Sequence, residues 1–180
     1  MERVFDQRIS TRLSVAVSLV DDFTQKERVI GGVKVAIPAL ELVAIRNPSG
    51  YHNFLDLADG THTVRIESEC YLDEETDMVL PTVSPRKIIL KPSPLYPFPH
   101  GTTLIRGVVS DGGGNPVFGV EIEGDGLTTA TSSTGEFVLY FPASEPERDI
   151  HIQAKKGALT GSADKRIKKG ETVSVTITIS

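Results

Sequence analysis

The stretch "SGYHNFLDLADGTHTVRIES", residues 49–68, alternates between apolar and polar residues on both sides of a break at "ADGT". This period of two is typical of half-buried β-strands, and Gly60 supplies the backbone freedom that a tight reversal requires. Two positions that would ordinarily be apolar or aromatic are the histidines His52 and His62. The stretch therefore predicts two neighbouring strands with both imidazoles directed inward.

The same alternation dominates the rest of the chain. It is clearest in "RLSVAVSLV" (12–20), "VKVAI" (33–37) and "TVSVTITIS" (172–180). β-branched residues are enriched there, as in antiparallel strands with one face on a core. The best helical candidate, "ECYLDEETDMVL" (69–80), is short and acidic. We therefore predict an all-β protein.

Composition narrows the classes of function. The chain has 180 residues, enough for one large domain or two small ones, and its net charge of −5 disfavours binding to nucleic-acid phosphates. A single cysteine, Cys70, excludes an intramolecular disulfide and a cysteine-rich metal site. We find no signal-peptide pattern and no apolar run of membrane-spanning length. The expectation is a cytoplasmic protein without membrane insertion, with association with a particle as the alternative.

A proline-rich segment, "KPSPLYPFPHG" (91–101), divides the sequence. Proline fixes φ and removes an N–H donor, so this segment is predicted to be a semi-rigid extended spacer and not a central strand. Tyr96 and Phe98 would pack into the two flanking domains and set their relative angle. The alternative is a proline-rich ligand for a small adaptor domain. The predicted division is a sandwich over 1–91, a linker over 92–101 and a second sandwich over 102–180.

The two halves have similar patterns. Each consists of a strand, a polar turn, a "G-V-x-I/V" strand, a small polar turn that ends in glycine, and another alternating strand. Aligning Gly50 with Gly135 brings these pieces into register. Such a repeat indicates two copies of one structural unit, each with its own core.

The second half resembles the carboxypeptidase regulatory-like domain, a transthyretin-like (prealbumin-like) β-sandwich. The resemblance is carried by "RGVVSDGGGNPVFGVEIEG" (106–124) and "TSSTGEFVLYF" (131–141). In the first half, the spacing of Gly50 to its apolar positions and to Gly60 matches the same pattern, with histidine in the two aromatic positions. The resemblance implies two tandem Greek-key sandwiches joined by the proline-rich linker. It implies a fold and no activity, because this module occurs in many unrelated proteins.

Candidate chemistry is sparse. His52 and His62 are interpreted as packing residues; the alternative is a metal or pH-sensing site with Cys70 or Glu69 nearby. The acidic run within 67–77 fits a solvated loop or a charged strand edge, and the basic residues within 155–169 fit a solvated hairpin. Neither half has the Lys and Asn pair that isopeptide-forming pilin modules require. We therefore predict no catalytic, cofactor-binding or metal-binding residues and no cofactor.

These observations predict a non-catalytic structural or adaptor subunit that assembles with protein partners, by self-association or in a multi-subunit complex. A phage-tail-like or contractile injection particle is one setting, by analogy alone. Two alternatives remain open. The first is a module that binds carbohydrate or another cell-surface ligand, and the second is a metal-dependent enzyme that uses His52 and His62.

Overall fold

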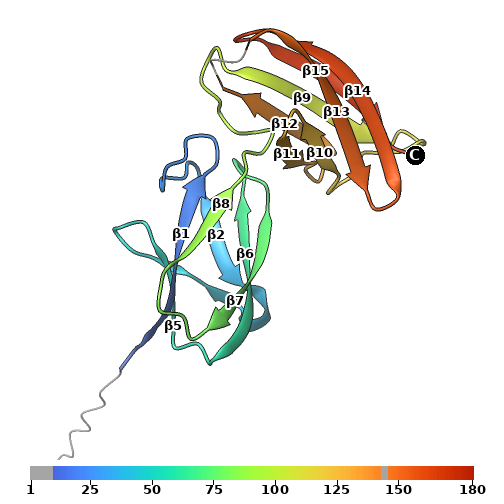
Figure 1. Ribbon diagram of the computed structural model, residues 1–180. Coiled ribbons are helices and arrows are strands. Elements are labelled where there is room, and N and C mark those ends of the chain that lie inside the picture. The colour runs from blue at the N-terminus through green and yellow to red at the C-terminus, as the bar shows by residue number, and fades with distance from the viewer. Residues whose placement is uncertain (1–9, 143–145) are drawn as a thin grey trace, which may run out of the picture.

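The computed structural model describes residues 10–142 and 146–180. Over these residues the chain forms four β-sheets and one short 3-10 helix, η1 (Pro38–Leu40). The predicted all-β class is confirmed. The N-terminal half and the C-terminal half meet at an elbow, which is visible in Figure 1.

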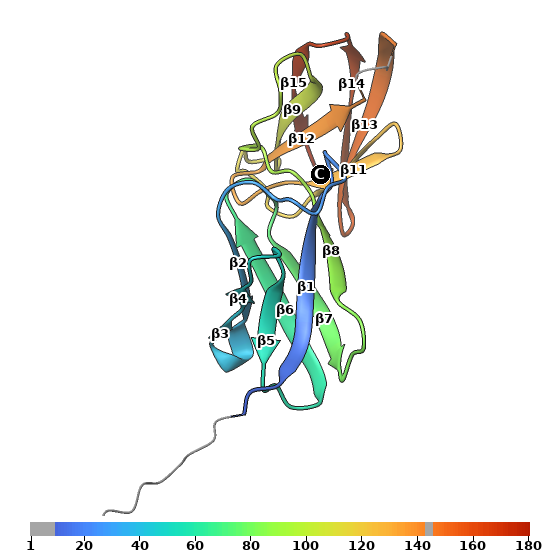
Figure 2. The same ribbon diagram turned by 90° about the vertical axis from the view of Figure 1, so that its left-hand side faces the viewer.

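The N-terminal half is built from two facing four-stranded sheets. One sheet has the order β4 (Ile45–Arg46), β5 (His52–Leu55), β1 (Leu13–Asp21) and β8 (Arg86–Leu90). The other has the order β3 (Leu42–Val43), β2 (Val33–Ile37), β6 (Gly60–Ser68) and β7 (Glu74–Leu80). In Figure 2, β1 and β5 lie in front of β6 and β7. The alternating apolar residues of both sheets are buried and form one cluster.

The C-terminal half also has two sheets. One has the order β12 (Glu136–Phe141), β9 (Thr103–Ser110) and β15 (Thr172–Thr178). The other has the order β11 (Leu127–Ala130), β10 (Glu121–Gly124), β13 (Arg148–Lys156) and β14 (Leu159–Ile167).

Strand pairing is the same in the two halves. The first strand, β1 or β9, pairs in parallel with the last strand, β8 or β15, and antiparallel with β5 or β12. Gly50 and Gly135 occupy equivalent places before β5 and β12, and their φ angles are 91° and 75°. A side chain is strained at such angles, which explains why both copies have glycine there.

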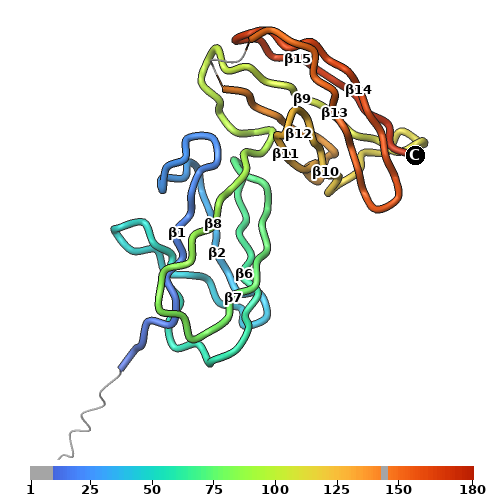
Figure 3. Tube along the Cα trace, in the orientation of Figure 1, coloured from blue at the N-terminus to red at the C-terminus, as the bar shows by residue number. Residues whose placement is uncertain are grey.

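Buried apolar residues form two separate clusters, one in each half. The first includes Val17, Val35 and Val64, and the second includes Ile105, Phe137 and Ile152. The Cα trace in Figure 3 passes from one half to the other along the yellow-green segment after β8. The exact division into 1–91, 92–101 and 102–180 stays a prediction, and residues 1–9 lie outside the described part of the chain.

Two segments show where the acidic run and the prolines lie in the fold. The acidic helical candidate at 69–80 is extended and contains β7, which lies at the edge of its sheet. Its carboxylates therefore line a strand edge, where charge discourages unwanted pairing. The proline-rich segment has no regular strand, as expected, but it is packed against the protein: Pro92 forms an isolated bridge with Tyr71, and Tyr96 is buried.

Candidate functional site

A buried carboxylate at the end of β1 organises the junction between the two halves. Asp21 is 1% exposed, and its Oδ2 accepts hydrogen bonds from the hydroxyls of Tyr71 at 3.0 Å and Tyr96 at 2.6 Å. Its Oδ1 accepts the backbone N–H of Phe23 at 2.8 Å. A buried carboxylate is tolerated only when it is hydrogen-bonded in this way. Asp21 thereby ties the end of β1 to the proline-rich segment.

The next residue makes the corresponding bond to the other half. The hydroxyl of Tyr140, on β12, donates to Oδ2 of Asp22 at 2.6 Å. Lys91 adds a second link, because its Nζ donates to the carbonyl oxygen of Thr128 at 2.9 Å and to the Thr128 hydroxyl at 2.7 Å. Arg106 donates to the carbonyl oxygen of Pro94. Polar contacts therefore cross the junction at separate points.

Aromatic rings fill the space around these polar contacts. Phe23 packs edge-on against Tyr140 with ring centroids 5.4 Å apart, and against Phe98 at 5.2 Å. Tyr96 packs against Phe98 at 4.7 Å. The Arg106 guanidinium lies over the Phe98 ring, 5.8 Å from its centroid. Because β12 and β9 contribute Tyr140 and Arg106 from the C-terminal half, the ring cluster belongs to both halves.

Burial raises the pKa of three tyrosine hydroxyls at the junction. It raises the pKa of the Tyr71 hydroxyl to about 12, although the Ile30 backbone N–H acts in the opposite direction. Burial, followed by the hydrogen bond to Asp21, raises the pKa of Tyr96. Burial, followed by the hydrogen bond to Asp22, raises the pKa of Tyr140. Tyrosine hydroxyls are already protonated at neutral pH, because their ordinary pKa is about 10, so all three act as donors, and the raised pKa values extend this to higher pH.

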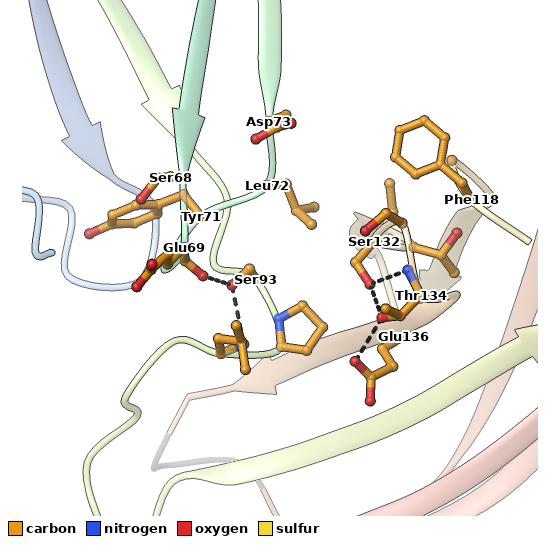
Figure 4. Close-up of a pocket in the computed structure, with 16 residues that line it drawn as sticks. Ser68, Glu69, Tyr71, Leu72, Asp73, Ser93, Phe118, Ser132, Thr134 and Glu136 are labelled. Atoms are coloured by element: carbon orange, nitrogen blue, oxygen red, sulfur yellow. Dashed lines mark hydrogen bonds between the residues drawn. The ribbon is translucent and has the colours of Figure 1, made fainter. Parts of the chain in front are cut away.

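A cleft of about 350 Å³ lies beside this network, between the two halves (Figure 4). Leu72 lines it from the N-terminal half, Leu95 from the proline-rich segment and Phe118 from the C-terminal half. The described residues of its lining include the carboxylates of Glu69, Asp73 and Glu136 and no basic side chain. The cleft therefore presents apolar surface inside a negatively charged rim.

The hydroxyl groups of this cleft are engaged in local hydrogen bonds. Ser93 Oγ donates to the carbonyl oxygen of Glu69 at 2.8 Å, and Thr134 Oγ1 donates to Glu136 Oε2 at 2.8 Å. Ser132 Oγ lies 2.9 Å from Thr134 Oγ1, as the dashed lines in Figure 4 show. Among the described residues that line this cleft, none carries an imidazole, thiol or amine.

The structure separates the two histidines. His52 lies on β5 and His62 on β6, and these strands belong to different sheets. The prediction that the histidines lie on neighbouring strands is wrong for that reason, although the strands follow one another in sequence. His52 is 5% exposed, and burial, together with the charge of Arg46, lowers its pKa. His62 is only partly buried, with Nε2 2.8 Å from the carbonyl oxygen of Ala58.

The other residues considered as metal ligands have different surroundings. Cys70 is partly buried and packs against the first apolar cluster, and Glu69 lines the cleft between the halves. Among residues 10–142 and 146–180, no group of three or more His, Cys, Asp or Glu is arranged to hold a metal ion. The same part of the chain has no helix that is long and apolar enough to cross a membrane. The expectation of no catalytic, cofactor-binding or metal residues stays a prediction.

Sequence reasoning missed the carboxylates at the junction. Asp21 falls on the inward register of β1, two residues after Leu19, and an acidic residue at a buried position is the signal that could have indicated it. Tyr71 and Tyr140 carried no comparable signal. The packing of Tyr96 and Phe98 at the junction was anticipated from their place among the prolines.

Comparison with known proteins does not assign this chain to a family. No protein-family model and no curated protein matches this sequence. Among solved structures, the Bacillus anthracis TIE protein is 11% identical with a TM-score of 0.36, over 93% of this chain and 34% of that one. A streptococcal ancillary pilin is 13% identical with a TM-score of 0.37, over 92% and 68%. BcpA, the major pilin subunit of Bacillus cereus, is 14% identical with a TM-score of 0.32, over 72% and 41%.

These likenesses are weak in every measure. The chain spans about a third of the length of the TIE protein that it matches. All three TM-scores lie below 0.5, so the likenesses carry no argument about the function of this chain.

Proposed function

We propose that this chain is a non-catalytic structural subunit in which two transthyretin-like sandwiches, related to carboxypeptidase regulatory-like domains, are held at a fixed angle for assembly with protein partners. The proposed units are residues 1–91 and 102–180, joined by the proline-rich segment 92–101. A phage-tail-like or contractile injection particle is one assembly in which such a subunit would serve, and the proposal does not depend on that setting. The cytoplasmic location stays a prediction outside this proposal.

The network of Asp21, Asp22 and the tyrosines is the observation that supports this function. A mobile linker would leave its backbone and side chains in solvent, whereas here Tyr96 is buried and bonds the end of β1. The bond from Tyr140 to Asp22 and the bond from Lys91 to Thr128 lie at separate places, so rotation at the junction would break at least one of them. Fixed geometry is what a spacer or adaptor contributes to an assembly, because it lowers the entropy lost on binding.

A distance measurement across the elbow tests the fixed angle. Spin labels on Val83→Cys in the β7–β8 turn and on Lys168→Cys after β14, in a Cys70→Ser background, report the separation of the two halves. With the labelled chain diluted in an excess of unlabelled chain, so that only distances within one chain are measured, we expect a single narrow distance distribution by pulsed electron spin resonance. In the same background, Tyr140→Phe removes only the hydroxyl that bonds Asp22, and this change should broaden the distance distribution.

Tyr51→Phe is the matched control, because the Tyr51 hydroxyl makes no hydrogen bond among the described residues. It should leave the distribution unchanged. A broad distribution in the parent protein would contradict the rigid junction. The assembly role is tested separately by capture of partners from the native source and by light scattering: a strict monomer that recovers no protein would contradict it.

A further inference from the structure

Large apolar side chains are exposed to solvent in the cleft between the halves, although exposed surface ordinarily carries polar groups. Leu95 is 74% exposed and Phe118 is 61% exposed, and both line the cleft. Exposed apolar groups gathered at a concave surface are typical of interaction sites. Glu69, Asp73 and Glu136 surround them, and no described lining residue is basic, although the Arg65 guanidinium lies 3.8 Å from Asp73 outside the lining. The complementary occupant is therefore an apolar side chain flanked by positive charge.

The chain itself carries a segment of that chemistry at the tip of the β13–β14 hairpin. The tip reads "KKGAL", residues 155–159, with exposed Lys155 and Lys156 on one strand and Leu159, 43% exposed, opposite Lys156 on the other. Gly157 turns the chain with a φ of 60°. In Figure 1 this hairpin projects from the C-terminal half, beyond the strands that flank it.

The tip and the cleft lie close together on the molecule. Lys156 Nζ donates to the carbonyl oxygen of Phe118 at 2.6 Å, and Phe118 lines the cleft. Pairing of β13 with β10 and β14 holds the hairpin in place, so we expect its tip not to fold into the cleft of its own chain. When two complementary features lie side by side on one chain, a two-fold axis allows each copy to receive the feature of the other.

We propose that a second copy of this chain occupies the cleft, with its Leu159 against Leu95 and Phe118 and its Lys155 and Lys156 facing Glu69 and Asp73. This inference rests on the proposed structural function and names its partner. The cleft volume of about 350 Å³ lies within the range of sites that enclose a bound group. The contact is reciprocal, so the product is a closed dimer and not a filament.

Sedimentation velocity of the full chain, over a wide range of protein concentrations, tests this contact. We expect a concentration-dependent dimer that weakens as salt rises, because screening reduces the lysine–carboxylate attraction. The variant Lys155→Glu/Lys156→Glu should weaken dimerisation about tenfold or more. The control Lys168→Glu/Lys169→Glu makes the same charge change after β14 and should leave the dimer intact.

A second tip variant guards against a local effect of losing the Lys156 bond to Phe118. Leu159→Asp should also abolish the dimer, whereas Val83→Asp, an equivalent change at a fully exposed residue of the β7–β8 turn, should not. Circular dichroism confirms that each variant is folded.

Mixing variants gives the sharpest result. Glu69→Lys/Asp73→Lys should be monomeric alone, and mixing it with Lys155→Glu/Lys156→Glu should restore a heterodimer, because both interfaces then pair opposite charges. A parent protein that stays monomeric, or a dimer that the tip variants do not weaken, overturns the proposal. A monomer with a narrow distance between its two halves would overturn the dimer and leave the proposed rigid subunit standing.

Discussion

The Tyr140 hydroxyl lies 2.6 Å from Oδ2 of Asp22, and this hydrogen bond joins residues 118 positions apart in sequence. It connects β12 of the C-terminal half to the residue that follows β1 of the N-terminal half. The bond therefore couples two cores that are otherwise separate clusters. The strength of this coupling can be measured as a change in the free energy of unfolding.

Removing the Tyr140 hydroxyl should destabilise the junction more than either sandwich. We expect Tyr140→Phe to lower the free energy of unfolding by about 1.5 kcal/mol, the scale of a hydrogen bond to a charged group. Urea denaturation followed by circular dichroism measures this loss. Asp22→Ala should cost a similar amount, and the double variant should cost little more than either single one. Additive losses would mean that the two groups do not stabilise each other.

Replacing Asp21 should be the most damaging single change at the junction. Asp21→Ala leaves the hydroxyls of Tyr71 and Tyr96 without their acceptor in a buried place, and we expect a loss of about 3 kcal/mol. Asp21→Asn keeps one carbonyl acceptor and should cost clearly less. Thermal unfolding of both variants makes the comparison. Equal losses would show that neither the volume nor the carbonyl oxygen of Asn replaces the carboxylate as the acceptor.

Alkaline pH should lower the free energy of unfolding, because it deprotonates the buried tyrosines. The ordinary pKa of tyrosine is about 10, and that of folded Tyr71 is raised to about 12. Since the folded value is the higher one, the stabilisation is complete below about pH 10 and is lost as pH rises towards about 12. Urea midpoints measured across this range should fall with pH, and Tyr71→Phe should reduce the slope. An unchanged slope in that variant would exclude Tyr71 as the source.

Mildly acidic pH should lower the free energy of unfolding, because it protonates His52. Burial, helped by the positive charge of Arg46, lowers its pKa below the ordinary value of about 6.5. The neutral ring is favoured in the folded state, so stability is present above pH of about 6.5 and is lost as pH falls through the folded value. His52→Phe should remove this part of the pH dependence, while His62→Phe, at a partly exposed site, should keep it. Denaturation midpoints from neutral to mildly acidic pH decide between the two.

A glycine in β9 should be intolerant of any side chain. A Cβ at Gly107 would lie 2.4 Å from Cε1 of Phe137 and 2.6 Å from Cγ1 of Val175, closer than packed atoms approach. We expect Gly107→Ala to cost about 2 kcal/mol or more through overpacking. Gly112→Ala is the control, because nothing lies within 4 Å of a Cβ there. Thermal denaturation of both variants should show a loss in the first alone.

Much of the local structure could be predicted because it depends on neighbours in sequence. Alternation of apolar residues indicates strands, since a strand exposes successive side chains on opposite faces. The equivalent places of Gly50 and Gly135 could also be read, because a turn with positive φ selects glycine. The separation of His52 from His62 could not, because sheet membership depends on which distant strands pair.

By itself the sequence determined the strands, the turns and the break at the prolines, which are consequences of backbone sterics and local burial. Only the tertiary structure decided how the halves meet, because the tyrosines that bond Asp21 and Asp22 come from segments 50 to 118 positions away in the chain. Their energies arise from desolvation and from hydrogen bonds between segments far apart in the chain. The cleft has the same origin, since Leu72, Leu95 and Phe118 come together only when both halves are in place.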